Sequence, residues 1–245
     1  MKPYQMHFTV TAEQADPNGL ALPSTLLYFA QEAAGEHCRL LGADRQALSS
    51  KNLFWAVIRH KLEITRLPAA GEAVLVETWP MPTTRSAYPR STAGYDTQGN
   101  LLFQIISLWV LMDVQTRAMV LPGKSGVQVE GMLRGDELAS PGSIAARPLP
   151  NCLQRTVTEA DLDINLHMNN TQYLDWIWDL QAQTPFAGKP LRGCSMCYLS
   201  EALLGQALTL TWDIPESGTL QVAIFRENPD TPGSQERVFS ALLVF

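Results

Sequence analysis

The chain has 245 residues, of which 46% are apolar and 17% are charged, and its formal net charge is −6. This composition is typical of a globular protein with a sizeable core and excludes a disordered or fibrous chain. The acidic balance argues against a nucleic-acid-binding protein, because such proteins usually carry a basic excess. The longest apolar run, LLFQIISLWVLM, contains Gln104 and Ser107 and is too short to span a membrane. The N-terminus lacks the apolar segment of a signal peptide, so we expect a cytoplasmic protein.

A short strand, a loop, one helix and several strands are predicted in the first half of the chain. The helix is expected from about Ser24 to Leu41, because apolar residues recur there at helical spacing and Ser24 is a suitable N-cap. Strands are expected at residues 53–67, 73–79, 85–95 and 101–114. Residues 121–150 are rich in proline and glycine and are predicted to form a linker.

The same order of elements is predicted in the second half. A helix should begin near Asn170, capped by Asn169 or Asn170, and strands should follow at residues 193–201, 206–212, 219–226 and 237–245. When Thr9 is placed over Thr156, the two halves are identical at Thr9, Val10, Thr11, Asp16, Asn18 and Leu27. These matches predict a duplication, with domains at residues 1–120 and 151–245. Each domain should pack one helix against an antiparallel sheet, which is an α+β fold.

The segment DLDINLHM begins at Asp161 and alternates polar with apolar residues. If it is extended, one side carries Asp161, Asp163, Asn165 and His167, and the other side is apolar. A half-exposed edge strand would show the same pattern. The first half, however, keeps Asp16 and Asn18 but has Leu20 where His167 stands. A titratable side chain in only one copy indicates chemistry rather than packing.

A second difference between the copies concerns Glu201. Counting four residues back from the glycine of the following turn gives Glu201 in the second half but Leu67 in the first. A carboxylate exposed at the end of a strand is an alternative explanation. Together with His167, Glu201 is a candidate general acid or base. Asp161 matches Gln14, so we expect for it only a supporting or solvent-facing role.

The four cysteines do not form a disulfide framework or a zinc site. Cys194 and Cys197 have the spacing C-x-x-C, but there is no second such pair. On a predicted strand their side chains would point to opposite faces. Buried structural thiols are therefore the better interpretation, and we expect neither a metal nor a cofactor.

Three segments in order resemble the motifs of acyl-acyl carrier protein thioesterases: FWAVIRHKLEI with GEAVLVETW, SLWVLMDVQTR, and TEADLDINLHMNNTQYLDW. The resemblance implies a double hotdog fold, in which each copy wraps a sheet around a central helix. It also implies hydrolysis of fatty acyl thioesters on acyl carrier protein (ACP), whose phosphopantetheine carries the acyl chain. The release of free fatty acid would end chain elongation. The family's catalytic residues fall on Asp163, Asn165, His167 and Glu201.

The chain departs from the family pattern in two places. A cysteine that often follows the catalytic glutamate is Ala202 here, so a thiol nucleophile at that position cannot be required. The TRR that commonly ends the first-half motif is TRA, at residues 116–118. The plastid transit peptide of the plant members is also missing, which favours a bacterial protein of the cytoplasm.

The expected chemistry is attack of water on a thioester that is already activated. In this hypothesis Glu201 and His167 activate the water, Asp163 supports that pair, and Asn165 holds the water or the carbonyl. Backbone N–H groups at residues 168–170 would polarise the carbonyl through the positive end of the second helix. Direct attack by the carboxylate, giving an anhydride, is the alternative.

Substrate contacts are expected from two places. Asn169 and Asn170 stand at the start of the second helix, and the first half offers an acyl pocket. Its candidate residues are Leu27, Phe29, Phe54 and Trp55. Ordinary core packing would explain each of these four residues equally well.

Two other functions fit the sequence. One is an acyl-CoA thioesterase of the same fold, because CoA and ACP thioesters share the pantetheine arm. The other is an acyl-binding hotdog protein without catalysis. The duplication supplies within one chain the pairing that single hotdogs obtain by dimerisation, so a monomer or a homodimer is expected. Neither nucleic acid nor a membrane is an expected partner.

Overall fold

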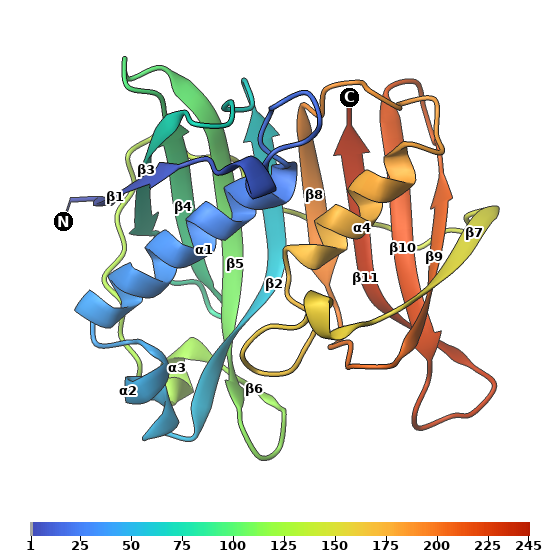
Figure 1. Cartoon of the computed structure of the whole chain (residues 1–245). Coiled ribbons are helices and arrows are strands. Elements are labelled where there is room, and N and C mark those ends of the chain that lie inside the picture. Colours follow the sequence, from blue (N-terminus) through green and yellow to red (C-terminus); the bar gives the residue numbers. More distant parts are fainter. Residues whose placement is uncertain (1) are drawn as a thin grey trace. The chain divides into compact units, whose positions relative to one another are not determined.

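The first half of the chain folds as an antiparallel sheet crossed by one long helix (Figure 1). The structure, a computed structural model, describes residues 2–245. The strand order is β1–β3–β4–β5–β2, and the short strand β6 pairs with β5. These elements are β1 (Tyr4–Thr9), α1 (Pro23–Leu40), α2 (Arg45–Ser49), β2 (Leu53–Ile64), β3 (Ala73–Pro80), β4 (Tyr88–Tyr95), β5 (Leu101–Asp113), β6 (Met119–Val120) and α3 (Pro122–Ser125).

The second half repeats this arrangement. Its strands follow the order β7–β9–β10–β11–β8, which corresponds strand for strand to the order in the first half. Helix α4 crosses this sheet as α1 crosses the first (Figure 1). The elements are β7 (Asn151–Thr156), α4 (Gln172–Gln181), β8 (Gly193–Tyr198), β9 (Ala207–Asp213), β10 (Thr219–Glu227) and β11 (Gln235–Val244).

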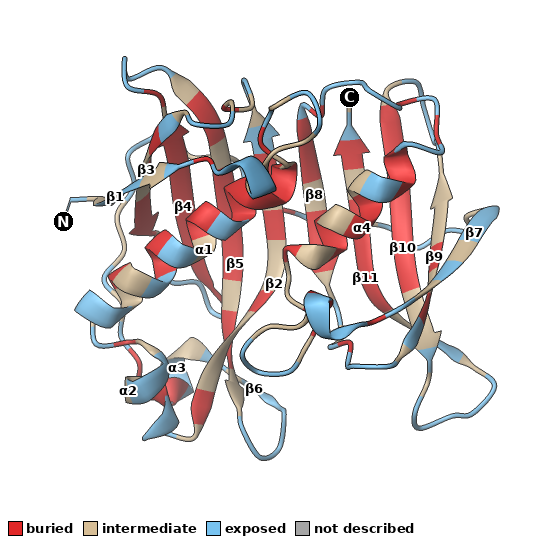
Figure 2. Cartoon of the chain, in the orientation of Figure 1, coloured by how far each residue is buried: buried red, intermediate tan, exposed pale blue. Residues whose placement is uncertain are grey.

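Helix α1 buries the face that the helical spacing predicts. Its buried side chains include Leu26, Leu27, Ala30, Ala33, Ala34 and His37. In Figure 2 the ribbon of α1 alternates between buried and exposed segments along its length. The predicted N-cap is wrong, because Pro23 occupies the first helical turn and Leu22 is the N-cap residue. Proline suits this position, since its fixed φ is helical and its missing N–H would have no helical acceptor.

Strand β5 ends one residue earlier than predicted and three other strands are shorter still, and for two of these the backbone shows why. Strand β2 ends at Ile64 because Thr65 N and Arg66 N both donate to the carbonyl of Leu102, at 2.9 and 3.1 Å. Strand β8 ends at Tyr198 in the same way, with Leu199 N and Ser200 N both on the carbonyl of Val238. Where two successive N–H groups share one carbonyl, the regular hydrogen-bond ladder between the strands is interrupted. Strand β4 begins at Tyr88 rather than at residue 85.

The cysteines agree with the sequence-based interpretation. Cys194 and Cys197 are free and buried on β8. Burial raises the pKa of the Cys194 thiol to about 12, so it stays protonated at neutral pH.

Contacts divide the chain into two compact units, Met1–Pro141 and Gly142–Phe245. Part of the segment expected to be a linker packs on the first unit. The Arg134 guanidinium lies 4.7 Å from the ring centre of Trp79, whose Nε1 donates to Glu137 at 3.1 Å. The predicted domain boundaries and the linker role of residues 121–150 stay predictions.

Candidate active site

The segment after Asp161 is a tight turn, not the extended strand that its alternation suggests. The Asp163 carboxylate accepts hydrogen bonds from Asn165 N (2.8 Å), His167 N (3.3 Å) and Asn165 Nδ2 (3.2 Å). The backbone closes the turn, because Leu166 N donates to the Asp163 carbonyl and Asp163 N donates to the His167 carbonyl. The predicted apolar side is also wrong, since Ile164 and Leu166 are largely exposed.

The first unit contains the same turn. The Asp16 carboxylate accepts from Asn18 N (2.9 Å), Leu20 N (3.0 Å) and Asn18 Nδ2 (3.3 Å). The turn needs one residue in the left-handed region, which is Gly19 (φ 77°) in the first unit and Leu166 (φ 63°) in the second. Asp163 and Asn165 therefore have a structural function that does not require His167. In the sequence, this structural function is indicated by the identity of Asp163 and Asn165 with Asp16 and Asn18.

Asp161 is buried and structural, so of the two roles expected for it the supporting one is confirmed and the solvent-facing one is wrong. Its carboxylate accepts from Thr158 N (2.8 Å), Thr158 Oγ1 (2.7 Å) and Trp176 Nε1 (2.8 Å). Burial alone would raise the pKa of Asp161, but the hydrogen bonds from Thr158 and Trp176 outweigh it and lower the pKa. The carboxylate thus caps the 3₁₀ turn Glu159–Asp161 and ties it to α4.

His167 and Glu201 lie together in the second unit. His167 Nδ1 is 3.4 Å from Glu201 Oε1, and the two side chains are 25% and 43% exposed. An antiparallel bridge between His167 and Leu203 holds the two loops at this separation, and Met168 N donates to the Ala202 carbonyl at 2.9 Å. The corresponding bridge in the first unit joins Leu20 to Ala69, so the same scaffold there carries no titratable pair. Solvent reaches both groups, as hydrolysis requires.

The loop of Glu201 is held by Arg226, which no sequence pattern singles out. Arg226 Nη1 donates to the Glu201 carbonyl at 2.5 Å, and Nη2 donates to Ser200 Oγ at 2.8 Å. Arg226 also pairs with Glu236 at 2.8 Å. Burial raises the pKa of the neighbouring Tyr173 phenol, while Arg226 opposes this rise and Glu201 adds to it. Tyr173 therefore stays neutral beside the pair.

Only one of the three N–H groups expected to polarise a carbonyl is available. Met168 N donates to the Ala202 carbonyl and Asn169 N to the Asp161 carbonyl, at 2.9 and 2.8 Å. Within residues 2–245, Asn170 N donates to no protein acceptor, and it precedes the first turn of α4. The N-cap residue of α4 is Thr171, not Asn169 or Asn170. Asn169 stabilises the backbone just before the helix, because its Oδ1 accepts from Thr171 N at 3.0 Å.

The acyl-pocket candidates of the first unit are in ordinary packing positions. Leu27 and Phe29 are buried in α1, and Phe29 stacks on Phe8 with ring centres 4.3 Å apart. Trp55 donates from Nε1 to the Ala43 carbonyl at 2.8 Å. Phe54 lies under the Arg117 guanidinium at 4.8 Å. A role of these four residues in holding an acyl chain stays a prediction.

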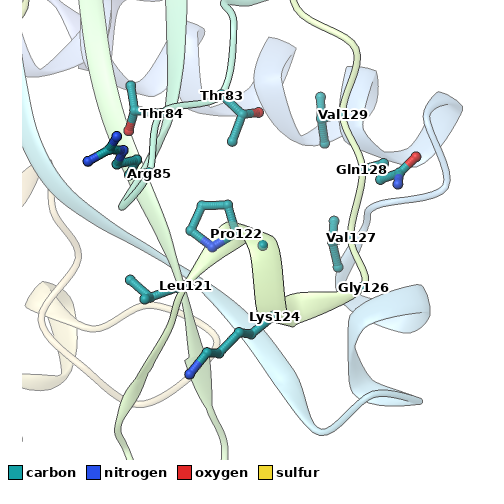
Figure 3. A pocket seen from close by; sticks show the side chains of 11 residues that line it. Thr83, Thr84, Arg85, Leu121, Pro122, Lys124, Gly126, Val127, Gln128 and Val129 are labelled. Atoms are coloured by element: carbon teal, nitrogen blue, oxygen red, sulfur yellow. The ribbon is translucent and has the colours of Figure 1, made fainter.

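An open groove of about 800 Å³ lies elsewhere in the first unit (Figure 3). It is lined by residues 83–85, 121–124 and 126–129, and none of the predicted site residues is among them. Within residues 2–245, no helix is long and apolar enough to cross a membrane. The same residues contain no group of three or more His, Cys, Asp or Glu side chains that could hold a metal ion.

Sequence comparison relates both halves of the chain to known thioesterases. The family model for the acyl-ACP thioesterase N-terminal domain matches residues 1–121, and that for the C-terminal domain matches residues 150–228. A palmitoyl-acyl carrier protein thioesterase of Gossypium hirsutum is 28% identical over 71% of this chain and 46% of its own length. A dodecanoyl-[acyl-carrier-protein] hydrolase of Cinnamomum camphora is 24% identical over 84% of this chain and 58% of its own length. The chain thus spans about half the length of the plant relatives it matches.

Solved structures with the same fold cover nearly the whole chain. An acyl-ACP thioesterase from Bacteroides thetaiotaomicron is 25% identical with a TM-score of 0.84, over 98% of this chain and 96% of the other. A 12:0-ACP thioesterase from Umbellularia californica has a TM-score of 0.79 at 19% identity, over 99% and 96%. These similarities and the repeated helix-on-sheet units confirm the predicted α+β double hotdog fold. With family models matching both halves, the chain belongs to the acyl-ACP thioesterase family.

Proposed function

We propose that this chain hydrolyses fatty acyl thioesters of ACP and releases the free fatty acid. The observation that carries the proposal is the His167–Glu201 pair, which stands on a repeated scaffold whose other copy has Leu20 and Leu67. The similarity to the palmitoyl-acyl carrier protein thioesterase and the dodecanoyl-[acyl-carrier-protein] hydrolase of plants supports ACP as the carrier. The similar Bacteroides protein supports a bacterial setting. We also propose that the chain is cytoplasmic and that it acts as a monomer or a homodimer.

The geometry of the pair favours His167 as the general base. Glu201 Oε1 faces Nδ1 of the imidazole, and a proton on Nδ1 leaves Nε2 as the acceptor in the neutral ring. Nε2 takes a proton from water as the water oxygen attacks the thioester carbonyl carbon. The carboxylate of Glu201 then stabilises the imidazolium. Collapse of the tetrahedral intermediate breaks the C–S bond, and the departing thiolate takes the proton from Nε2.

Two other groups assist in this proposal. The Asn170 N–H, at the positive end of α4, donates to the oxygen of the tetrahedral intermediate. Asp163 is a positioning residue, because it contacts the backbone of His167 rather than its ring. Asn165 is exposed beside it and can hold the water or the carbonyl.

Turnover of matched substrates tests this function. The wild-type chain should hydrolyse acyl-ACP thioesters, with higher kcat/KM than for the acyl-CoA thioesters of the same chain length. A range of chain lengths on each carrier should be assayed for free thiol release. Higher kcat/KM on every CoA thioester would assign the chain to acyl-CoA hydrolysis. Binding without turnover on any thioester would make it a non-catalytic acyl-binding protein.

A further inference from the structure

An exposed apolar surface borders the His167–Glu201 pair in the second unit. It consists of Ile164, Leu166, Leu203 and Leu204, which are 79%, 70%, 41% and 53% exposed. We refer to these four residues as the apolar rim. Leu166 precedes His167 in sequence, and Leu203 is bridged to His167. Leu204 follows Leu203 in the same loop.

The first unit lacks this surface at the equivalent positions. The repeat places Pro17, Gly19, Ala69 and Ala70 at the positions of Ile164, Leu166, Leu203 and Leu204. The turns have the same hydrogen bonds in both units, so folding of the turn does not require the larger side chains. The rim is therefore present only in the copy that carries the titratable pair.

Leu166 also occupies a backbone conformation that does not favour leucine. Its φ of 63° lies in the left-handed region, where a Cβ atom is unfavourable and glycine is preferred. Gly19 takes this position in the first unit with φ 77°. The leucine side chain is thus exposed and conformationally disfavoured, which points to a function outside folding.

On the basis of the proposed function, we propose that the apolar rim binds the pantetheine arm of the substrate. The rim contacts groups close to the reacting carbon, because two of its members adjoin His167. A fatty acyl chain needs a cavity closed to water, whereas the rim stands in solvent. The arm remains at the mouth of the site, and its methylene groups and paired methyl groups match leucine side chains.

Charge makes a lipid surface a poor alternative. The two rim segments, residues 161–170 and 199–206, contain Asp161, Asp163 and Glu201 but neither lysine nor arginine. Anionic membranes attract surfaces rich in basic residues, and the whole chain carries a formal charge of −6. A neutral, partly apolar ligand is consistent with these loops.

The test substitutes the rim with the residues of the first unit. In the triple variant Leu166→Gly, Leu203→Ala, Leu204→Ala we expect KM for acyl-pantetheine, acyl-CoA and acyl-ACP to rise by about tenfold or more, with kcat within about twofold. Hydrolysis of the same acyl group on 2-mercaptoethanol, which lacks the arm, should change by less than about twofold. Leu133→Ala removes an exposed leucine of the first unit and is the matched control. A melting temperature at or above that of wild type shows that the triple variant is folded.

Several results would overturn the proposal. An equal loss on the mercaptoethanol thioester would assign the rim to the acyl chain or to the chemistry. A loss on acyl-ACP alone would assign it to the protein surface of the carrier. An unchanged KM on every substrate would remove the arm as its ligand.

A binding measurement separates this proposal from the proposed function. If the wild-type chain hydrolyses no thioester, the proposed function fails, and the rim is tested by calorimetric titration with a non-hydrolysable S-alkyl pantetheine thioether. Binding that weakens about tenfold in the triple variant supports the rim as the arm site. Equal affinity of both proteins, or no binding to either, contradicts it.

Discussion

Asp163 shows how one residue can serve both the fold and the site. Its carboxylate accepts from two backbone N–H groups, one of which belongs to His167, and Asp16 does the same in the first unit. The aspartates therefore shape both turns, and in the second unit the turn carries the imidazole. This arrangement separates a structural effect from a catalytic one within a single chain.

Removal of the two aspartates should give different results for stability and activity. Asp16→Ala and Asp163→Ala each delete comparable hydrogen bonds, so each should lower the free energy of unfolding by about 1–2 kcal/mol. Only Asp163→Ala should also lower kcat, by about tenfold or more, because the imidazole is no longer held toward Glu201. Denaturant titration and thioester assays measure the two quantities. A normal kcat in folded Asp163→Ala would show that the turn does not position His167.

Among the elements, the loops and the short elements α2, β6 and α3 escaped sequence-based prediction. The face of α1 and most strand limits follow from periodicity, because burial against a neighbouring layer imposes it. In residues 161–168 the alternation was accidental, since a capped 3₁₀ turn and a tight turn have no period of two. The first copy contains the turn sequence Asp16-Pro17-Asn18-Gly19, and applying it to residues 163–166 would have predicted the turn.

The site itself was partly predictable for a similar reason. His167 and Glu201 were found because they differ between the copies, and the structure brings them together. The occupied N–H group of Met168 and the role of Arg226 depend on hydrogen bonds between segments distant in sequence. No local pattern encodes such pairings. Comparison of the copies therefore reveals what differs in chemistry but not which backbone groups remain free.

Strand β2 contains a buried histidine that should make stability depend on pH. His60 Nδ1 lies 2.8 Å from Ser107 Oγ, and burial lowers the pKa of His60 from 6.5 to about 3. The folded chain thus keeps His60 neutral, while the unfolded chain binds a proton below pH 6.5. Stability should fall as the pH drops from about 6.5 toward 4, by about 1 kcal/mol per pH unit. Above pH 6.5 neither state binds this proton, and the effect disappears.

Replacement of His60 isolates this contribution. In His60→Asn the slope of unfolding free energy against pH between 4 and 6.5 should become shallower by about 1 kcal/mol per unit. Burial and the nearby Arg90 lower the pKa of His37 to about 4. His37 is unchanged in this variant and keeps its own contribution to the slope. Urea titrations at several pH values measure the slopes. Identical slopes for wild type and variant would mean that His60 is protonated in the folded protein.

At the scale of the whole molecule, the chain is one scaffold used twice. Strand order, the doubled donors at the ends of β2 and β8, the turns and the isolated bridges all recur. Around the turn, the titratable pair and the apolar rim are present in the second unit and not in the first. The shared backbone geometry is therefore kept in both copies, and the proposed chemistry belongs to the second copy alone.

The most direct test of this account is a double-mutant cycle on the pair. His167→Leu and Glu201→Leu introduce the residues of the first copy, and each should lower kcat for acyl-ACP by about two to four orders of magnitude. Because the two groups act as a unit, the double variant should be little slower than either single variant. Leu20→Ala, at the matching position of the first unit, should keep the wild-type kcat. Additive losses, or a wild-type rate in either folded leucine variant, would contradict the central claim that His167 and Glu201 together hydrolyse the thioester.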